Sequence, residues 1–394
     1  MEDKKGNWIT VELYTSFLYD GMILNGDLLT EDGEKVASAK ETITAKLIEE
    51  LKARNIKKLF YIKPSRKKEL KKDLFPREEK VEQAFVLSQE IAFRVERKAV
   101  LPVKEIESTV EELINEISNS KPETVLNLIE LKEYDEYTYT HSVNVSLISI
   151  SFARILNWEY ERLKNLGIGA MLHDIGKLLL PKEIINKKGK LTKEEYEIVK
   201  KHTIYGYEIV KAQPEFGETV QKIPLLHHEC YNGSGYPFGL SGEKLDEVSQ
   251  IVSMADTFDA TISKRSYKEG YPMWNAFLYI HKNAGSRFIP RLAIEFVNKM
   301  PSIIAGEPVL KVGDFVILNT KEIGEIIELS DKSTLKPVVN IYLNSNQQKV
   351  KFPIRVMLEV DVTRWIETII SEEKLIETLK RIKSEFIKKE ENKK

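Results

Sequence analysis

Apolar and polar residues alternate near the start of the chain and then follow a longer period. Residues 8–13 read Trp-Ile-Thr-Val-Glu-Leu, the two-residue alternation of a strand with one buried face. Residues 42–51 have helical spacing with Thr42 as the expected N-cap, and residues 58–62 return to a strand pattern. We therefore expect a small α+β domain over residues 1–75. It holds no histidine or cysteine, so a structural or regulatory role is expected for it.

A long helical region follows. Apolar residues recur every three or four positions over residues 77–95 and 103–117, with charged residues between them, as in amphipathic helices. Residues 143–150 are more apolar, so we expect this helix in the middle of a bundle. The pattern predicts a helical linker over residues 76–124 and an all-α domain over residues 125–303.

Short strands are indicated from about residue 309. Residues 314–318, 324–329 and 338–343 are rich in β-branched and aromatic side chains and are separated by turn residues, which predicts an antiparallel meander. Residues 365–387 have the period of an amphipathic helix. The expected fold class is therefore mainly α: a central all-α helical bundle with a small α+β N-terminal domain and a short β-rich C-terminal extension over residues 304–394.

Composition narrows the class of protein. The 394 residues include 60 Lys and Arg against 61 Asp and Glu, so the chain has no broad positive field for a long nucleic acid. No run approaches the roughly 20 apolar residues that a membrane helix needs, and the charged first residues do not resemble a signal peptide. With a single cysteine, Cys230, the sequence predicts a cytoplasmic protein without structural disulfides.

The chemically distinctive residues gather in one part of the chain. Five of the six histidines and two aspartates fall there: His141, His173, Asp174, His202, His227, His228 and Asp256. Neutral imidazoles and carboxylates are ligands for divalent iron, manganese or zinc. An aspartate next to a histidine, such as Asp174 after His173, can bridge two ions about 3.5–4 Å apart that deprotonate a water between them.

These residues also have simpler explanations. A single histidine such as His202 is more often a surface residue or a satisfied core residue, and the pair at 227–228 is also compatible with a charged helix end. His281 is expected on a solvated helix face. The segment 173–177 is harder to explain in this way, because a histidine, an aspartate and a lysine interrupt an apolar helix. Burying them without a metal or mutual pairing would cost much free energy.

Two segments resemble the signatures of the HD-GYP subgroup of the HD phosphohydrolase superfamily. Residues 173–177 (HDIGK) match the pattern HDxGK, and residues 227–237 (HHECYNGSGYP) match HHExxDGxGYP except that Asn232 replaces an aspartate. The segments around His141 and Asp256 are similar as well, so the resemblance covers about residues 125–300. It implies an HD-type helical bundle for the central domain.

The resemblance also assigns roles to single residues. It implies a metal set of His141, His173, Asp174 and Asp256, with His202, His227 and His228 completing a second metal. The cofactors implied are two divalent transition metal ions, with iron or manganese favoured and zinc as the other choice. Lys177, beside the phosphate, and Asp174, between the metals, are the implied catalytic residues. The implied substrate contacts are Arg265, Lys268, Gly235 and Tyr236. Tyr137 stands where some three-metal members carry a glutamate, which favours two metals here.

Members of this subgroup hydrolyse cyclic di-GMP to pGpG and in some cases to GMP. The resemblance therefore implies a metal-dependent cyclic di-GMP phosphodiesterase in which a metal-bridging hydroxide attacks the phosphate. Two alternatives stay open: a catalytically weak module that binds cyclic di-GMP or a protein partner, which Asn232 suggests, and a phosphohydrolase of another cyclic dinucleotide. A protein partner at the GYP loop or the N-terminal domain, a lid at residues 178–200 and a homodimer are open as well.

Overall fold

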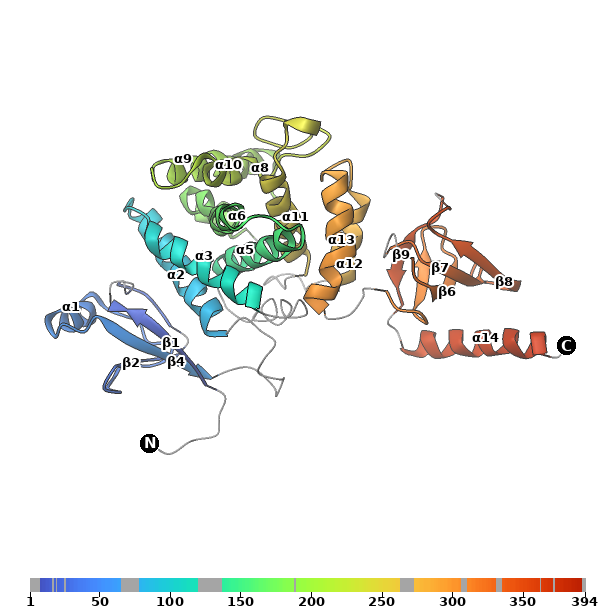
Figure 1. The fold of residues 1–394 in the computed structure, drawn as a ribbon, viewed down its shortest axis with the longest axis horizontal. Helices are drawn as coiled ribbons and strands as arrows, with labels where there is room; N and C mark the ends of the chain where they lie inside the picture. Colours follow the sequence, from blue (N-terminus) through green and yellow to red (C-terminus); the bar gives the residue numbers. More distant parts are fainter. Residues whose placement is uncertain are drawn as a thin grey trace. The chain divides into compact units, whose positions relative to one another are not determined.

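The computed structural model describes residues 8–15, 18, 20–24, 26–64, 78–119, 137–187, 189–262, 273–305, 310–330, 335–361, 363–370 and 373–391. The chain forms two compact units, Met1–Asp259 and Ala260–Lys394 (Figure 1). Most of the described chain is helical, with one small sheet in each unit, as the expected mainly α fold class requires. The finer domain boundaries stay a prediction of the sequence.

The first unit begins with a four-stranded antiparallel sheet. Its strands, in spatial order, are β1 (Trp8–Tyr14), β4 (Lys58–Pro64), β2 (Asp27–Thr30) and β3 (Lys35–Ala37), with α1 (Ala45–Ala53) between β3 and β4 in the chain. The expected cap of α1 is wrong by two residues. The hydroxyl of Thr44 accepts the N–H of Leu47 at 3.2 Å, whereas Thr42 forms an isolated β-bridge with Ile23. Tertiary pairing of Thr42 therefore delays the helix start.

The helical part of this unit contains α2 (Glu78–Glu96), α3 (Val103–Asn119), α5 (Tyr137–Ile155), α6 (Tyr160–Leu172), the 3₁₀ helix η3 (Ile175–Leu179), α7 (Lys182–Ile185), α8 (Lys193–Lys200), α9 (His202–Lys211), α10 (Glu218–Leu226), the 3₁₀ helix η4 (Gly242–Lys244) and α11 (Glu247–Ile262). Figure 1 shows α5 and α6 side by side in the interior, with α2 and α3 on one side of them. Residues of α5 such as Leu147, Ile150 and Phe152 are completely buried. The prediction of a buried central helix over 143–150 is therefore confirmed.

The helix α2 joins the sheet to the helical part. Val86 belongs to the same buried apolar cluster as Leu28, Leu51 and Tyr61 of the sheet region. The helix α2 also packs against α5 and against η3, the element that follows Asp174. One helix thus shares a core with the N-terminal sheet and reaches the part of the chain that holds the distinctive histidines.

The second unit contains α12 (Met273–Lys282), α13 (Pro290–Ala305), a five-stranded antiparallel sheet and α14 (Glu373–Glu391). In spatial order the strands are β8 (Lys349–Met357), β7 (Val338–Leu343), β6 (Ile323–Glu328), β5 (Phe315–Leu318) and β9 (Ile366–Ile369). The meander of β5, β6 and β7 is confirmed. The sequence missed β8, although its residues alternate in character.

The helix predicted over residues 365–387 begins later in the structure than the sequence pattern indicated. Residues 366–369 form β9, which pairs with β5, and the helix begins at Glu373. The β-branched residues Ile366, Thr368 and Ile369 suit a strand, and β5 offers an edge for them to pair with. None of the described helices is long and apolar enough to cross a membrane.

Candidate metal centre

The seven side chains predicted as metal ligands lie together in the first unit. They come from α5, from the ends of α6 and α10, from the start of α9 and from α11: His141, His173, Asp174, His202, His227, His228 and Asp256. Their ligand atoms form two groups. The four-ligand group is Asp174, His202, His227 and His228, and the three-ligand group is His141, His173 and Asp256. Within each group all ligand atoms lie within 4.8 Å of one another.

Helix ends and a close backbone approach produce this arrangement. His173 and His227 are the C-cap residues of α6 and α10, and His202 is the first residue of α9. A Cβ at Gly176 would stand 2.0 Å from the carbonyl oxygen of His202 and 2.5 Å from the backbone nitrogen of Gly206. Glycine at 176 therefore lets η3 lie directly against α9, which brings the preceding Asp174 to His202.

Asp174 lies between the two groups and presents a different oxygen to each. Its Oδ2 is 3.3 Å from Nε2 of His173 and 3.7 Å from Nε2 of His141. Its Oδ1 is 3.4 Å from Nε2 of His202 and 3.7 Å from Nε2 of His227. A carboxylate placed in this way has the geometry of a bridging ligand for two ions.

Hydrogen bonds at Nδ1 orient four of the histidine rings. The acceptors are Oδ2 of Asp259 for His141 at 2.8 Å, and the carbonyl oxygens of Ala170 for His173 at 2.7 Å, Val199 for His202 at 2.6 Å and Pro224 for His227 at 2.9 Å. Because a carbonyl oxygen can only accept, Nδ1 must donate in the last three. Their Nε2 atoms then carry lone pairs and face the cluster, the arrangement that metal-binding histidines need.

Two buried polar atoms in the centre fit a metal ion. Nε2 of His173 and Oδ1 of Asp174 are buried and have no hydrogen-bond partner within the described chain. Leaving such an atom unsatisfied costs about 1–3 kcal/mol. A divalent ion would satisfy both, and mixed imidazole and carboxylate donors suit iron, manganese or zinc. The residues present therefore fit the two divalent metals that the resemblance implied.

The two carboxylates of the centre favour their charged forms. Burial raises the pKa of Asp174, but the positive charge of Lys177 opposes it and holds that pKa well below its usual value. Burial acts in the same direction on Asp256, and the hydrogen bond from His141 outweighs it, so that the pKa of Asp256 is also well below its usual value. Both carboxylates are therefore ionised at neutral pH, which is the form that binds a cation.

The histidines differ between the groups. Burial lowers the pKa of His202 to about 3 and of His228 well below its usual value. Burial also lowers the pKa of His227, against the opposing hydrogen bond to Asp174. For His141 burial is outweighed by hydrogen bonds to Asp256 and Asp259, which raise its pKa to about 9. The three histidines of the four-ligand group are therefore neutral at pH 7, with one ring nitrogen free to bind a metal, whereas His141 is protonated and must lose one proton to bind a metal.

Lys177 and a small pocket border Asp174. Lys177 makes an ion pair with Oδ2 of Asp174, and its side chain is 30% exposed, so it can also face a ligand.

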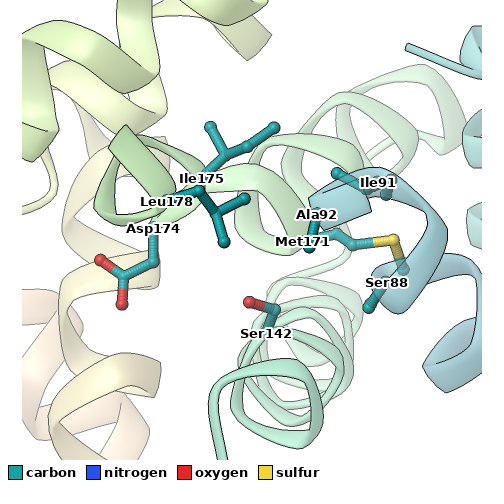
Figure 2. A pocket seen from close by; sticks show the side chains of 8 residues that line it. All are labelled: Ser88, Ile91, Ala92, Ser142, Met171, Asp174, Ile175 and Leu178. Atoms are coloured by element: carbon teal, nitrogen blue, oxygen red, sulfur yellow. The ribbon is translucent and has the colours of Figure 1, made fainter. Parts of the chain in front are cut away.

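The pocket is lined by Ser88, Ile91, Ala92, Ser142, Met171, Asp174, Ile175 and Leu178. In Figure 2 the Asp174 carboxylate points away from the α2 residues Ser88, Ile91 and Ala92. The helix α2 thus forms a wall of this pocket.

Asn232, which stands where the HD-GYP pattern has an aspartate, makes hydrogen bonds within the loop after His228. Oδ1 of Asn232 accepts hydrogen bonds from the N–H of Ser234 at 3.0 Å and from its hydroxyl at 2.6 Å. An amide oxygen serves here as a carboxylate oxygen would. Gly233 follows with a φ of +80°, which glycine adopts without strain. Asn232 therefore supplies an acceptor oxygen that a carboxylate at this position would also offer.

Some predicted residues fall outside the description. Arg265 and Lys268 lie outside the described residues, and so does the side chain of Tyr137, although its backbone begins α5.

His281 is half-buried on α12 of the second unit rather than fully solvated. Gly235 and Tyr236 lie in the loop that follows His228, and the ring of Tyr236 is 4.8 Å from that of His228.

Sequence reasoning missed two residues that support the ligands. Asp259 is completely buried, and it binds Nδ1 of His141 and, through Oδ1, the side-chain N–H of Asn144 at 2.9 Å. Glu229 is also completely buried, and it accepts backbone N–H groups of the following loop. One signal was available: Asp259 follows Asp256 by three positions on the same helix, so both face one side.

The central part of the chain is similar to known proteins. The model of the HD domain family matches residues 114–292. The chain is 34% identical over 251 residues to a cyclic di-GMP phosphodiesterase of Pseudomonas aeruginosa, covering 62% of this chain and 58% of that protein. It is 37% identical over 180 residues to the cyclic di-GMP phosphodiesterase response regulator RpfG of Xanthomonas campestris, covering 45% of this chain and 48% of that protein.

A solved structure shares the fold. An HDG"Y"P protein of Bdellovibrio bacteriovorus matches with a TM-score of 0.50 and 19% identity, over 74% of this chain and 99% of that one. The chain spans only 58% and 48% of the lengths of the two relatives named above, so the likeness to them concerns a shared segment. Residues 114–292 of this chain therefore match the HD domain family, and the chain is similar over part of its length to cyclic di-GMP phosphodiesterases.

Proposed function

We propose that this protein is a metal-dependent phosphodiesterase that hydrolyses cyclic di-GMP to pGpG, with further cleavage to GMP left open. The observation that carries the proposal is the position of Asp174, whose two oxygens face two separate groups of ligands. The names of the relatives support the choice of substrate.

The proposed site residues have two roles: some would hold the metal ions, and Lys177 would stabilise charge on the phosphate. Two divalent transition metals, iron or manganese before zinc, would offset the charge of the phosphodiester and lower the pKa of a water to about 7. His141, His173, Asp174, His202, His227, His228 and Asp256 would hold them. Asp174 would keep the two ions at a fixed separation, and the partly exposed Lys177 would stabilise the negative charge that develops on the phosphate oxygens.

Substrate contacts are proposed on the sequence pattern. Arg265 would bind the second phosphate through paired N–H donors, and Lys268 would add a point charge. Gly235 and Tyr236 would line the mouth of the site. A location in the cytoplasm, a homodimer and a protein partner at the GYP loop or the N-terminal domain stay predictions of the sequence.

The test is turnover by purified protein handled without oxygen and reconstituted with Fe²⁺ or Mn²⁺. We expect cyclic di-GMP to be converted to pGpG, and we expect Asp174→Ala to abolish the reaction. The proposal fails if metal-loaded protein leaves cyclic di-GMP intact. Tight binding of the nucleotide without product would instead identify a binding module. Faster cleavage of another cyclic dinucleotide, such as cyclic di-AMP, would change the substrate and keep the chemistry.

A further inference from the structure

His228 differs from the other four histidines of the centre. The rings of those four are each held by a hydrogen bond at Nδ1, whereas the ring of His228 makes no hydrogen bond within the described part of the chain. Its neighbours are aromatic rings: His227 at 4.0 Å, Tyr236 at 4.8 Å and His202 at 5.1 Å between centroids. The orientation of His228 therefore depends on packing.

Tyr236 is the neighbour of His228 that is not itself a proposed ligand. Its ring is inclined by 34° to that of His228, so the two rings lie partly face to face. The helix α8 supports Tyr236 further: the Tyr196 ring is 6.3 Å away at 82°, and Nζ of Lys200 is 5.6 Å from the Tyr236 centroid. An edge-to-face aromatic pair and a nearby cation both favour a fixed ring position.

The backbone joins Tyr236 to His228 as well. The N–H of Tyr236 donates to the carbonyl oxygen of His228 at 3.3 Å. A Cβ at Gly235 would stand 2.3 Å from the backbone nitrogen of Cys230 and 2.5 Å from Cα of Glu229. The loop therefore packs on the two residues that follow His228, and only glycine fits at position 235.

Glu229 fixes the far side of this loop. Its completely buried carboxylate accepts the N–H of Phe238 at 2.7 Å and the N–H of Leu240 at 2.9 Å. Its carbonyl oxygen accepts the side-chain N–H of Gln250, on α11, at 3.0 Å. A buried carboxylate without such donors would be costly, so loop and carboxylate stabilise each other. Glu229 thereby ties the loop to the chain segment that carries His228.

We propose that Tyr236, anchored by Glu229, is a positioning residue that orients His228 for metal binding. The loop 231–241 then sets the affinity of the four-ligand group for its ion and leaves the three-ligand group unaffected. This inference deepens the proposed function and rests on it, and it gives Tyr236 a role besides the substrate contact suggested by the sequence pattern.

The experiment measures bound metal directly. Wild type, Tyr236→Phe, Tyr236→Ala and His228→Ala are titrated with Mn²⁺, and bound ions are counted by elemental analysis after equilibrium dialysis. We expect wild type and Tyr236→Phe to bind two ions alike, because the ring is kept. The ion of the three-ligand group is called the first ion and that of the four-ligand group the second ion. We expect Tyr236→Ala to keep the first ion and to bind the second ion about 10–100-fold more weakly, the usual effect of losing a group that orients a ligand. The double variant, with alanine at both Tyr236 and His228, should lose no more affinity for the second ion than His228→Ala alone.

Two further variants test the anchor. Glu229→Gln replaces one acceptor oxygen with an N–H₂ group that cannot accept a backbone N–H, so it should also weaken the second ion only. Glu243→Gln makes the same chemical change at an exposed position of the neighbouring 3₁₀ helix, and it should bind both ions as wild type does. If Tyr236→Ala binds two ions with wild-type affinity, or if Tyr236→Phe is as weak as Tyr236→Ala, the inference is wrong. Wild type that binds fewer than two ions would refute the proposed metal centre itself.

Discussion

The two halves of the candidate metal centre are built in different ways. In the three-ligand group, His141 is held by the buried Asp259 of α11 and His173 by a carbonyl oxygen of its own helix. In the four-ligand group, His228 follows a helix end and is held by the ring of a loop residue, Tyr236. The first half is therefore part of the helical core, whereas the second half is completed by a loop, the kind of segment that changes shape most easily.

The largest effect is expected where the halves meet. Asp174→Ala removes the carboxylate whose two oxygens face the two groups. We expect both ions and the proposed activity to be lost together, while the far-ultraviolet circular dichroism stays that of the wild type. Elemental analysis and turnover of cyclic di-GMP measure the two effects. Retention of both ions would contradict the bridging position of Asp174.

The contact between η3 and α9 can be broken next. In Gly176→Ala the new Cβ would meet backbone atoms of His202 and Gly206, which cannot move aside as a side chain can. We expect the free energy of unfolding to fall by about 3 kcal/mol, the upper range for overpacking, and the four-ligand group to lose affinity with it. Urea denaturation measures the change.

A matched control for Gly176→Ala is Gly217→Ala. A Cβ at Gly217 has no atom within 4 Å, and this residue is the N-cap of α10, where alanine is less favourable than glycine. The free energy of unfolding of Gly217→Ala should fall by about 1 kcal/mol from the weaker cap alone, well short of the loss in Gly176→Ala. Equal losses in the two variants would mean that the close approach of η3 and α9 is not what Gly176 provides.

The three-ligand group can be weakened by itself. Asp259→Asn keeps the size of the side chain and removes the charge that faces Nδ1 of His141. We expect the first ion to bind about 10–100-fold more weakly, with the second ion little changed, which is the opposite pattern to Tyr236→Ala. Competition with a metal-sensitive dye distinguishes the two ions. The same loss in both variants would refute the division into a core half and a loop half.

The smallest effect is expected at the helix that supports Tyr236. Thr192 and Glu195 form a capping box at the start of α8, with the Thr192 hydroxyl accepting the N–H of Glu195 at 3.2 Å. Thr192→Ala should cost about 1 kcal/mol of stability. Affinity for the first ion should stay at the wild-type value. Thermal unfolding monitored with and without Mn²⁺ checks both statements, and a weaker first ion would contradict the second.

Local patterns predicted the elements well wherever local chemistry decided them. The helices over 77–95 and 103–117 and the three predicted strands of the C-terminal meander are in place, because periodicity is a property of neighbouring residues. The errors at Thr42 and at residues 365–372 have one cause. In both places a distant strand or residue offered the backbone hydrogen bonds that a helix would otherwise supply.

The candidate site divides in the same way. The ligand types, their order and the family signatures could be read along the chain, since they are matters of composition and spacing. The supporting roles of Asp259 and Glu229 could be read only in part: Asp259 follows Asp256 by three positions and Glu229 is a fixed position of the signature, but neither pattern shows what the carboxylate contacts. Its role depends on which donors the fold brings to it.

The amino-acid sequence by itself determined the helical centre, the two small sheets around it and a set of imidazoles and carboxylates suited to divalent ions. Only the tertiary structure decided that these side chains meet, that Asp174 turns one oxygen to each group, and that His228 depends on Tyr236. The physical reason is that ligand geometry is set by contacts between helices distant in the chain, and such contacts follow from packing and burial rather than from any local pattern.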